Sequence, residues 1–152
     1  MKPMVRTFAV PVCVVALGAG AIVWNLERTR ITQRKLADEA RLVQSRADKG
    51  DANAECKLGL MYVFGRGVPQ DYAQAKSWFQ KAADQGQAKA MYSIGNLYYY
   101  GDGVAQIYSD ALIWYRKAAD KGYPLAEYML GSMNYYGYGV PQSYSESLVY
   151  RL

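Results

Sequence analysis

The stretch that decides the fold runs from Ala54 to Gly86 and reads AECKLGLMYVFGRGVPQDYAQAKSWFQKAADQG. A similar stretch, AMYSIGNLYYYGDGVAQIYSDALIWYRKAADKG, spans Ala90 to Gly122, and a third begins at Ala126. The offset is 36 residues each time, and a fixed period of roughly 20–50 residues indicates a repeat protein. Each unit is too small to bury its own apolar face, so neighbouring units are expected to stack into a solenoid.

Each unit is predicted to form two helices joined by a glycine-rich turn. Apolar residues three or four positions apart between Ala54 and Tyr62 predict the first helix. The turn at 65–71 contains two glycines and a proline, which end that helix, and its Asp71 is suited to cap the second. The second helix ends at Gly86. The chain is therefore predicted to alternate helix, turn and helix.

Glycine recurs inside each predicted first helix, at Gly59, Gly95 and Gly131. A glycine in a helix interior costs about 1 kcal/mol relative to alanine. A cost repeated in three units needs a packing reason. We expect a neighbouring helix to pass where a side chain would clash.

The recurring positions resemble the Sel-one-like repeat (SLR), the 36-residue relative of the tetratricopeptide repeat. In the first unit these positions are Ala54, Leu58, Gly59, Tyr62, Gly65, Gly67, Val68, Asp71, Ala75, Trp78, Ala82, Ala83 and Gly86. The departures are Ile107 for the capping Asp, Asn134 for a Tyr and Ser147 for an Ala. The resemblance covers residues 51–152. It implies an all-α, right-handed α-solenoid that scaffolds protein complexes and has no catalytic residues.

The repeat register divides the chain into segments. The sequence at 47–50 is identical to that at 119–122, and Leu36 takes the position of Tyr72, which predicts a degenerate capping helix before the first repeat. The predicted segments are 1–24 (signal anchor or signal peptide), 25–50 (linker and capping helix), 51–86, 87–122 and 123–152 (repeats). The third repeat stops within its second helix, so we expect a truncated or partner-covered end, with 143–152 the least protected helix.

Composition argues against several function classes. The chain has no His, which removes the commonest general base and metal ligand, and no cofactor motif is present. Residues 1–50 hold nine Lys or Arg and four Asp or Glu, whereas residues 51–152 hold nine of each. A neutral array has no electrostatic footprint for nucleic acid. Cys13 and Cys56 are expected to be small buried hydrophobes. We therefore predict a protein that is not an enzyme.

An uncharged run of seventeen residues, from Phe8 to Trp24, follows Lys2 and Arg6. It fits a cleavable signal peptide, because small residues suited to cleavage lie at 19–21. It also fits an uncleaved single-span anchor, since such a helix rises about 26 Å. The apolar residues beyond Ala21 favour the anchor. Basic residues on both sides of the run leave either topology open for the anchor. The signal-peptide reading requires export of the array and the anchor reading allows it, so we expect the array outside the cytoplasm, in a periplasm or bacterial cell envelope, or secreted after cleavage.

All fifteen tyrosines lie in residues 51–152. A helical wheel places many of them on the first-helix side opposite the core, the side that lines the concave groove in tetratricopeptide-like solenoids. In the first repeat, these positions are 53, 56, 60, 63 and 64. The predicted partner-binding residues of the next two repeats are Tyr92, Asn96, Tyr99, Tyr100, Tyr128, Ser132, Tyr135 and Tyr136.

Tyr92 and Tyr128 oppose the core most directly on this wheel. Packing between repeats is the alternative role for these rings, because tyrosine buries a large area. Exposed tyrosine is a favoured residue at protein interfaces. The sequence thus predicts a non-catalytic, membrane-tethered or exported scaffold that binds a protein or peptide. The alternative is an envelope protein that binds cell-wall glycan, since sugars also stack on aromatic rings.

Overall fold

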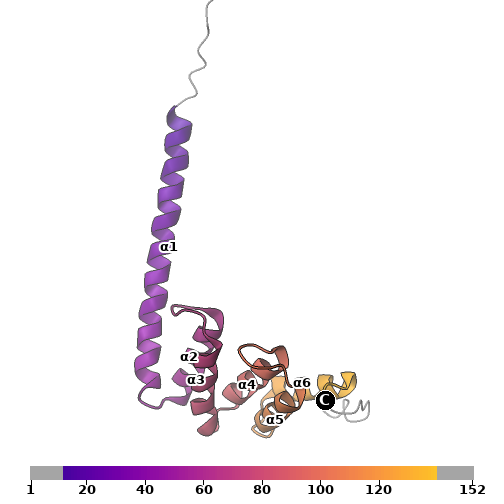
Figure 1. The fold of residues 1–152 in the computed structure, drawn as a ribbon. Coiled ribbons are helices and arrows are strands. Elements are labelled where there is room, and N and C mark those ends of the chain that lie inside the picture. The colour runs from indigo at the N-terminus through magenta and orange to yellow at the C-terminus, as the bar shows by residue number, and fades with distance from the viewer. Residues whose placement is uncertain (1–11, 140–152) are drawn as a thin grey trace, which may run out of the picture.

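A computed structural model describes residues 12–139, with the side chains of Trp24 and of residues 26–139 (Figure 1). Within that range the chain forms only helices and turns. In chain order they are α1 (Val12–Ala47), α2 (Ala52–Phe64), α3 (Tyr72–Asp84), α4 (Ala88–Tyr100), α5 (Tyr108–Ala119) and α6 (Pro124–Tyr136). Each helix packs on the next, so the predicted all-α solenoid is confirmed.

Capping residues mark the helix ends. Asp71 and Gly65 are predicted from the sequence, whereas the cap at Asp51 is a finding of the structure. The Asp51 carboxylate accepts hydrogen bonds from the backbone N–H groups of Asn53 and Ala54, which begins α2. The Asp71 carboxylate accepts one from Gln74 at the start of α3. Ile107 replaces the capping Asp in the next repeat, and α5 has no side-chain cap. Left-handed glycines end the first helices, at Gly65, Gly101 and Gly137.

The glycines inside the first helices are explained by aromatic rings on the following helices. A Cβ atom on Gly59 would lie 2.5 Å from the Phe79 ring, and one on Gly95 would lie 2.7 Å from the Tyr115 ring. Real Cβ atoms do not approach carbon this closely. The predicted packing reason is confirmed for these two glycines.

The turns set the spacing between successive repeats. A Cβ atom on Gly103 would overlap Tyr72, and one on Gly139 would lie 2.9 Å from the backbone of Tyr108. In the same way, one on Gly67 would overlap the backbone of Leu36 in α1. The three contacted positions are 36 residues apart. The C-terminal part of α1 therefore lies where the second helix of a preceding repeat would lie.

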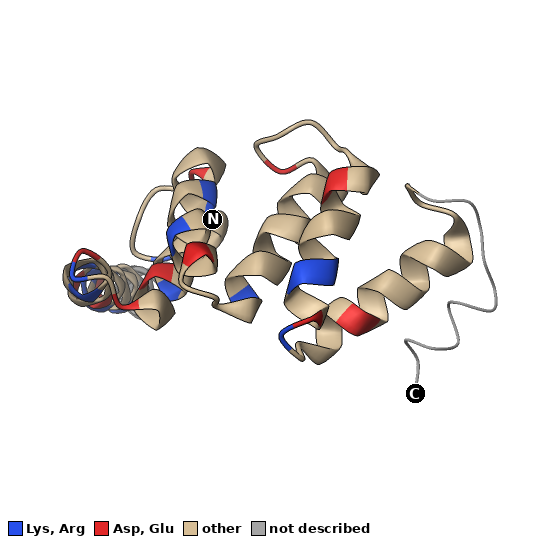
Figure 2. Ribbon diagram, turned by 90° about the horizontal axis from the view of Figure 1, so that it is seen from below, with Lys and Arg blue, Asp and Glu red and all other residues tan. Residues whose placement is uncertain are grey.

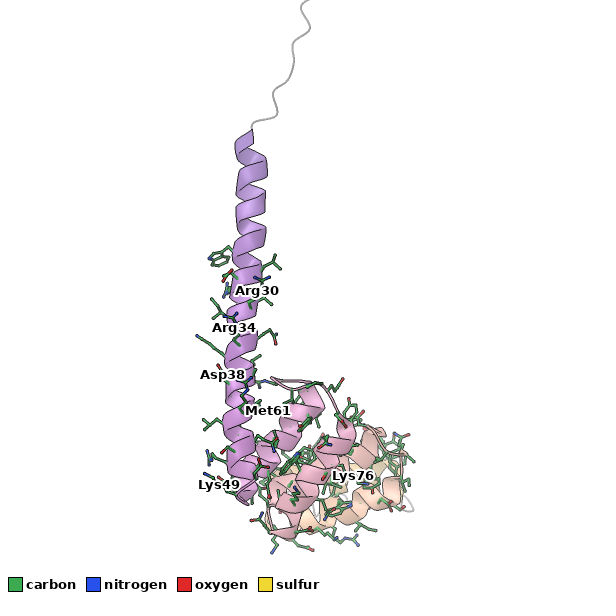
Figure 3. All side chains as sticks on the ribbon, turned by 60° about the vertical axis from the view of Figure 1, so that its left-hand side comes forward. Arg30, Arg34, Asp38, Lys49, Met61 and Lys76 are labelled. Atoms are coloured by element: carbon green, nitrogen blue, oxygen red, sulfur yellow. The ribbon has the colours of Figure 1, made fainter. Side chains whose placement is uncertain are left out.

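The core is continuous along the array. Ala40, Val43 and Ala47 of α1 pack with Leu58 and Met61 of α2 in one buried cluster, and Figure 3 shows Met61 on the side of α2 nearest α1. A second cluster joins α2 through α6. The remainder of α1 extends away from the array (Figure 1). This helix is continuous through residues 24 and 25, so no irregular linker separates the two predicted N-terminal segments.

Two predictions involve residues outside the described range. The predicted membrane anchor or signal peptide begins at Phe8, before the first described residue. The predicted incomplete last helix lies entirely within 140–152, after the last described residue. Among the helices that the structure describes, none is both long and apolar enough to cross a membrane.

Candidate partner-binding surface

The first helices of the three repeats all end on an exposed aromatic residue. Phe64 is the last residue of α2, Tyr100 of α4 and Tyr136 of α6. Their side chains are 67%, 63% and 59% exposed, respectively. These three residues, 36 positions apart, are here named the aromatic ladder. The exposed rings therefore recur at the same position of each repeat.

Tyrosine rings connect the second and third repeats into one network. Tyr92 lies between Tyr115 and Tyr123, with ring centroids 5.6 and 5.2 Å away. Tyr99 contacts Tyr115 at 6.5 Å. Other rings join it through tilted, stacked and edge-to-face contacts, namely Tyr100, Tyr108, Tyr138, Tyr136 and Tyr135. Such pairs stabilise by about 0.5–1.5 kcal/mol each beyond their buried area, so the network holds the ladder's C-terminal rungs in place.

Comparison with known proteins identifies the repeat unit. The Sel1 repeat model matches residues 52–87, 88–123 and 124–150. The chain belongs to the Sel1 repeat family. Sel1 repeats generally mediate protein–protein interactions, and the family generally consists of non-catalytic scaffolds.

Two solved structures of Sel1 repeat proteins resemble this fold. A protective antigen of uropathogenic Escherichia coli, which displays an SLR fold, is 40% identical with a TM-score of 0.70, over 73% of this chain and 24% of the antigen. A Sel1 repeat protein from Oxalobacter formigenes is 42% identical with a TM-score of 0.69, over 73% of this chain and 85% of that protein.

One curated protein shares part of the Sel1 array. This is the ERAD-associated E3 ubiquitin-protein ligase component HRD3A of Arabidopsis thaliana, 42% identical over 45 residues. The match covers 29% of this chain and 7% of HRD3A. The chain thus spans less than a quarter of the length of both HRD3A and the E. coli antigen.

The structure sorts the eight predicted binding residues of the Sel1 repeats by exposure. Tyr100, Tyr128, Tyr135 and Tyr136 are exposed. Tyr92, Asn96, Tyr99 and Ser132 are only partly exposed. Among the exposed four, Tyr100, Tyr135 and Tyr136 belong to the ring network, whereas Tyr128 makes no ring contact within the described residues.

Tyr92 was expected to point away from the core with its ring exposed, but other rings partly cover it. Tyr115 of α5 and Tyr123 in the following turn lie against its ring. Asn96 is similarly occupied, because its side-chain carbonyl accepts a hydrogen bond from the Tyr115 hydroxyl at 2.7 Å. A helical wheel describes one helix alone and omits the residues that the next helix brings over it.

Residues missing from the predicted set also contribute to this surface. Phe64 completes the aromatic ladder, and Tyr108 stacks on Tyr138 with centroids 4.9 Å apart and an interplanar angle of 15°. Tyr138 lies in the turn that follows α6. Position 64 was on the predicted face, although Phe64 was not among the eight predicted residues. For Tyr108 and Tyr138, the available signal was the aromatic content of the second helix and the turn, which a search confined to first helices does not use.

Three tyrosine hydroxyls of this surface, those of Tyr99, Tyr115 and Tyr123, have a raised pKa and are neutral at ordinary pH. Burial, followed by the neighbouring Tyr92, raises the pKa of Tyr115 and of Tyr123. Burial also raises the pKa of Tyr99, with adjacent tyrosines adding to the effect. Within residues 12–139 no group of three His, Cys, Asp or Glu side chains could hold a metal ion. The chemistry of this surface is therefore ring stacking and neutral hydrogen bonding.

Proposed function

We propose that the chain is a non-catalytic scaffold that binds a peptide segment of another protein along the face formed by α2, α4 and α6. The observation that carries this proposal is the aromatic ladder, because Phe64, Tyr100 and Tyr136 place an exposed ring at the same point of each repeat. Aromatic residues dominate binding energy at protein interfaces, where they combine large apolar area with few rotatable bonds.

The spacing of the ladder favours an elongated partner. Solenoids present continuous surfaces across successive repeats, and such surfaces suit extended or helical segments. Residues 123–139 contain a single charged side chain, Glu127, and Figure 2 shows correspondingly little charge on α6. The C-terminal part of this face would therefore recognise apolar and hydrogen-bonding groups.

Site-specific photocrosslinking tests this proposal. A photoreactive phenylalanine analogue is placed at Tyr100 or Tyr136 in the full chain, and in parallel at Ile113. Ile113 is 55% exposed but lies on α5, outside the ladder. We expect discrete protein adducts from positions 100 and 136 and none from position 113.

The crosslinked protein is then purified and its affinity for the full chain measured. Combined Tyr100→Ala and Tyr136→Ala should weaken binding by about 2 kcal/mol or more, with unchanged helicity by circular dichroism because both rings are exposed. Adducts that form equally from position 113, or binding that ignores both substitutions, would contradict the proposal. The pair Tyr92 and Tyr128 is less suitable, since Tyr92 is only partly exposed and packs against the fully buried Tyr115.

Cell-wall glycan is the second candidate ligand. The exposed rings of the aromatic ladder are flat surfaces of the kind on which sugars stack. The full chain should then sediment with peptidoglycan freed of protein, and combined Tyr100→Ala and Tyr136→Ala should abolish sedimentation. If the full chain does not sediment with peptidoglycan, glycan is excluded as the ligand and the peptide proposal is the one that remains.

The uncharged run from Phe8 to Trp24 supports a further part of the proposal, that the array is tethered to a membrane or exported. An uncleaved anchor should resist carbonate extraction and retain Met1 or Lys2 at the N-terminus. A mature chain beginning near Ile22 would indicate a signal peptide and a secreted or periplasmic array. A cytoplasmic, carbonate-soluble chain with an intact N-terminus would contradict both.

A further inference from the structure

A cavity of about 400 Å³ lies at the N-terminal end of the ladder. Its apolar walls include Cys56, Leu60 and Phe64 of α2. The remaining lining comes from α1, the first turn and the beginning of α4, through Glu39, Arg66 and Lys89. The volume is at the lower end of the range for ligand pockets, roughly 300–1,000 Å³, which suits one or two side chains of a bound peptide.

The lining of this cavity differs from the equivalent face of the second Sel1 repeat. Cys56 and Leu60 occupy the positions that Tyr92 and Asn96 occupy in the second repeat. There the Tyr92 ring and the Asn96–Tyr115 hydrogen bond take up the corresponding face. The smaller, apolar residues of the first repeat leave that face hollow. Phe64 belongs both to the cavity and to the aromatic ladder, so the two are adjacent.

The charge of the cavity lining is unbalanced. Lys57 is paired with Glu39 at 2.6 Å. Arg66 and Lys89 also line the cavity, and neither forms an ion pair within the described residues. Arg66 lies close enough to Glu39 to contribute, after Lys57, to lowering its carboxyl pKa. With three cations and one carboxylate, the lining would attract a negatively charged group.

We propose that this cavity holds an apolar side chain of the peptide partner while an adjacent carboxylate of the peptide binds Arg66 and Lys89. The inference rests on the proposed peptide-binding function and adds the chemistry of the partner: an acidic residue close to a Leu-, Met- or Phe-like residue. The apolar side chain would contact Leu60 and Phe64. The rest of the segment would continue along Tyr100 and Tyr136.

A random-peptide display library, selected on the full chain in mild detergent, tests this chemistry directly. We expect recovered peptides to be enriched in Asp or Glu within a few positions of a large apolar residue. Combined Arg66→Gln and Lys89→Gln should reduce the affinity of these peptides about tenfold or more, and raised salt should weaken the parent complex. Leu60→Trp, which fills the cavity and leaves both cations, should also reduce affinity.

The matched control is combined Arg116→Gln and Lys121→Gln, an equal loss of charge at exposed positions that do not line the cavity. It should leave affinity unchanged. Peptides that need Tyr100 and Tyr136 but show no acidic preference and ignore Arg66 and Lys89 would overturn this inference alone. Recovery of no peptide, or of peptides indifferent to both surfaces, would overturn the proposed function as well. Acidic peptides that need the cations but not the ladder would support the cavity and contradict the ladder.

Discussion

The first and second repeats share one backbone plan but use different chemistry at the same pair of positions. In the second repeat, the fully buried Tyr115 donates its hydroxyl to Asn96. In the first, the equivalent residues are Phe79 and Leu60, which lie in one apolar cluster. Each ring covers a helix glycine, Gly95 or Gly59. Both rings thus pack on a helix glycine, whereas a ring hydroxyl is present only in the second repeat, where Asn96 accepts its hydrogen bond.

This difference extends to the outer face of the array. Tyrosines follow Asn96 on the second repeat, where the face is filled and aromatic. Leu60 instead borders the cavity beside Arg66. Neighbouring repeats with the same fold can therefore present different chemical groups, because the face residues vary while the glycines and the rings that pack on them are retained.

Exchanging the ring chemistry in the first repeat should have the largest effect on stability. Phe79→Tyr places a hydroxyl in a fully buried site next to apolar Leu60, so unfolding free energy should fall by about 2 kcal/mol. Adding Leu60→Asn copies the second repeat and should recover at least half of that loss. Urea unfolding measures both. A double variant no more stable than Phe79→Tyr would show that the two positions are not coupled in this repeat.

The reverse exchange in the second repeat should have a smaller effect. Tyr115→Phe removes the hydrogen bond to Asn96 and should cost about 1 kcal/mol, since the partly exposed Asn96 can bind water instead. Combined with Asn96→Leu, the variant should approach the parent in unfolding free energy. A loss above about 3 kcal/mol for Tyr115→Phe would mean that the hydroxyl has a larger role than this bond.

Alkaline pH should distinguish the two ring positions further. Burial raises the pKa of Tyr115 above the ordinary value of 10.0. The unfolded chain then loses that proton first, so the contribution of Tyr115 to stability is complete well below pH 10 and falls as the pH rises through 10 and above. At pH 10.5, Tyr115 should account for a loss of about 0.8 kcal/mol. The fall in urea-unfolding free energy between pH 8 and 10.5 should be smaller by this amount in Tyr115→Phe. An identical pH dependence would exclude this assignment.

Cys56 supplies the smallest expected effect, which concerns reactivity near neutral pH. Burial raises the pKa of its thiol to about 11 from 9.0. The reactive species is the thiolate, so in a Cys13→Ser variant iodoacetamide at pH 8 should modify folded Cys56 much more slowly than unfolded Cys56. Equal modification rates in the folded and unfolded chain would mean that Cys56, in the cavity wall, is open to the reagent.

The sequence was sufficient to predict the architecture because each element is marked locally. Asp71 begins a helix and Gly65 ends one, as predicted, and the 36-residue spacing of Gly59 and Gly95 anticipates the rings that pack on them. The binding face was predicted less completely. Tyr92 and Asn96 were placed from their own helix, whereas Tyr115, which contacts both, comes from the next one. A periodic pattern predicts the side of the helix on which a side chain lies, but not which residues of the next helix pack against it.

The cavity could not be predicted from the sequence pattern, because its lining comes from several helices. Glu39, Phe64 and Lys89 belong to three different helices and meet only after α1 and α4 have packed beside α2. The spacing of these residues along the chain does not indicate that they lie close together. Tertiary contacts determine which of the outward positions remain open.

The length of α1 has a mechanical consequence. Its 36 residues form a rod about 54 Å long, and it packs on the array only towards its C-terminal end, where Ala40, Val43 and Ala47 are buried. Residues 26–35, including Arg30 and Arg34, are exposed on the projecting part (Figure 3). A straight helix clamped at one end is a spacer with a fixed stand-off. It would hold the repeats tens of ångströms from whatever the start of α1 is joined to, and any rotation of that rod would turn the ladder with it.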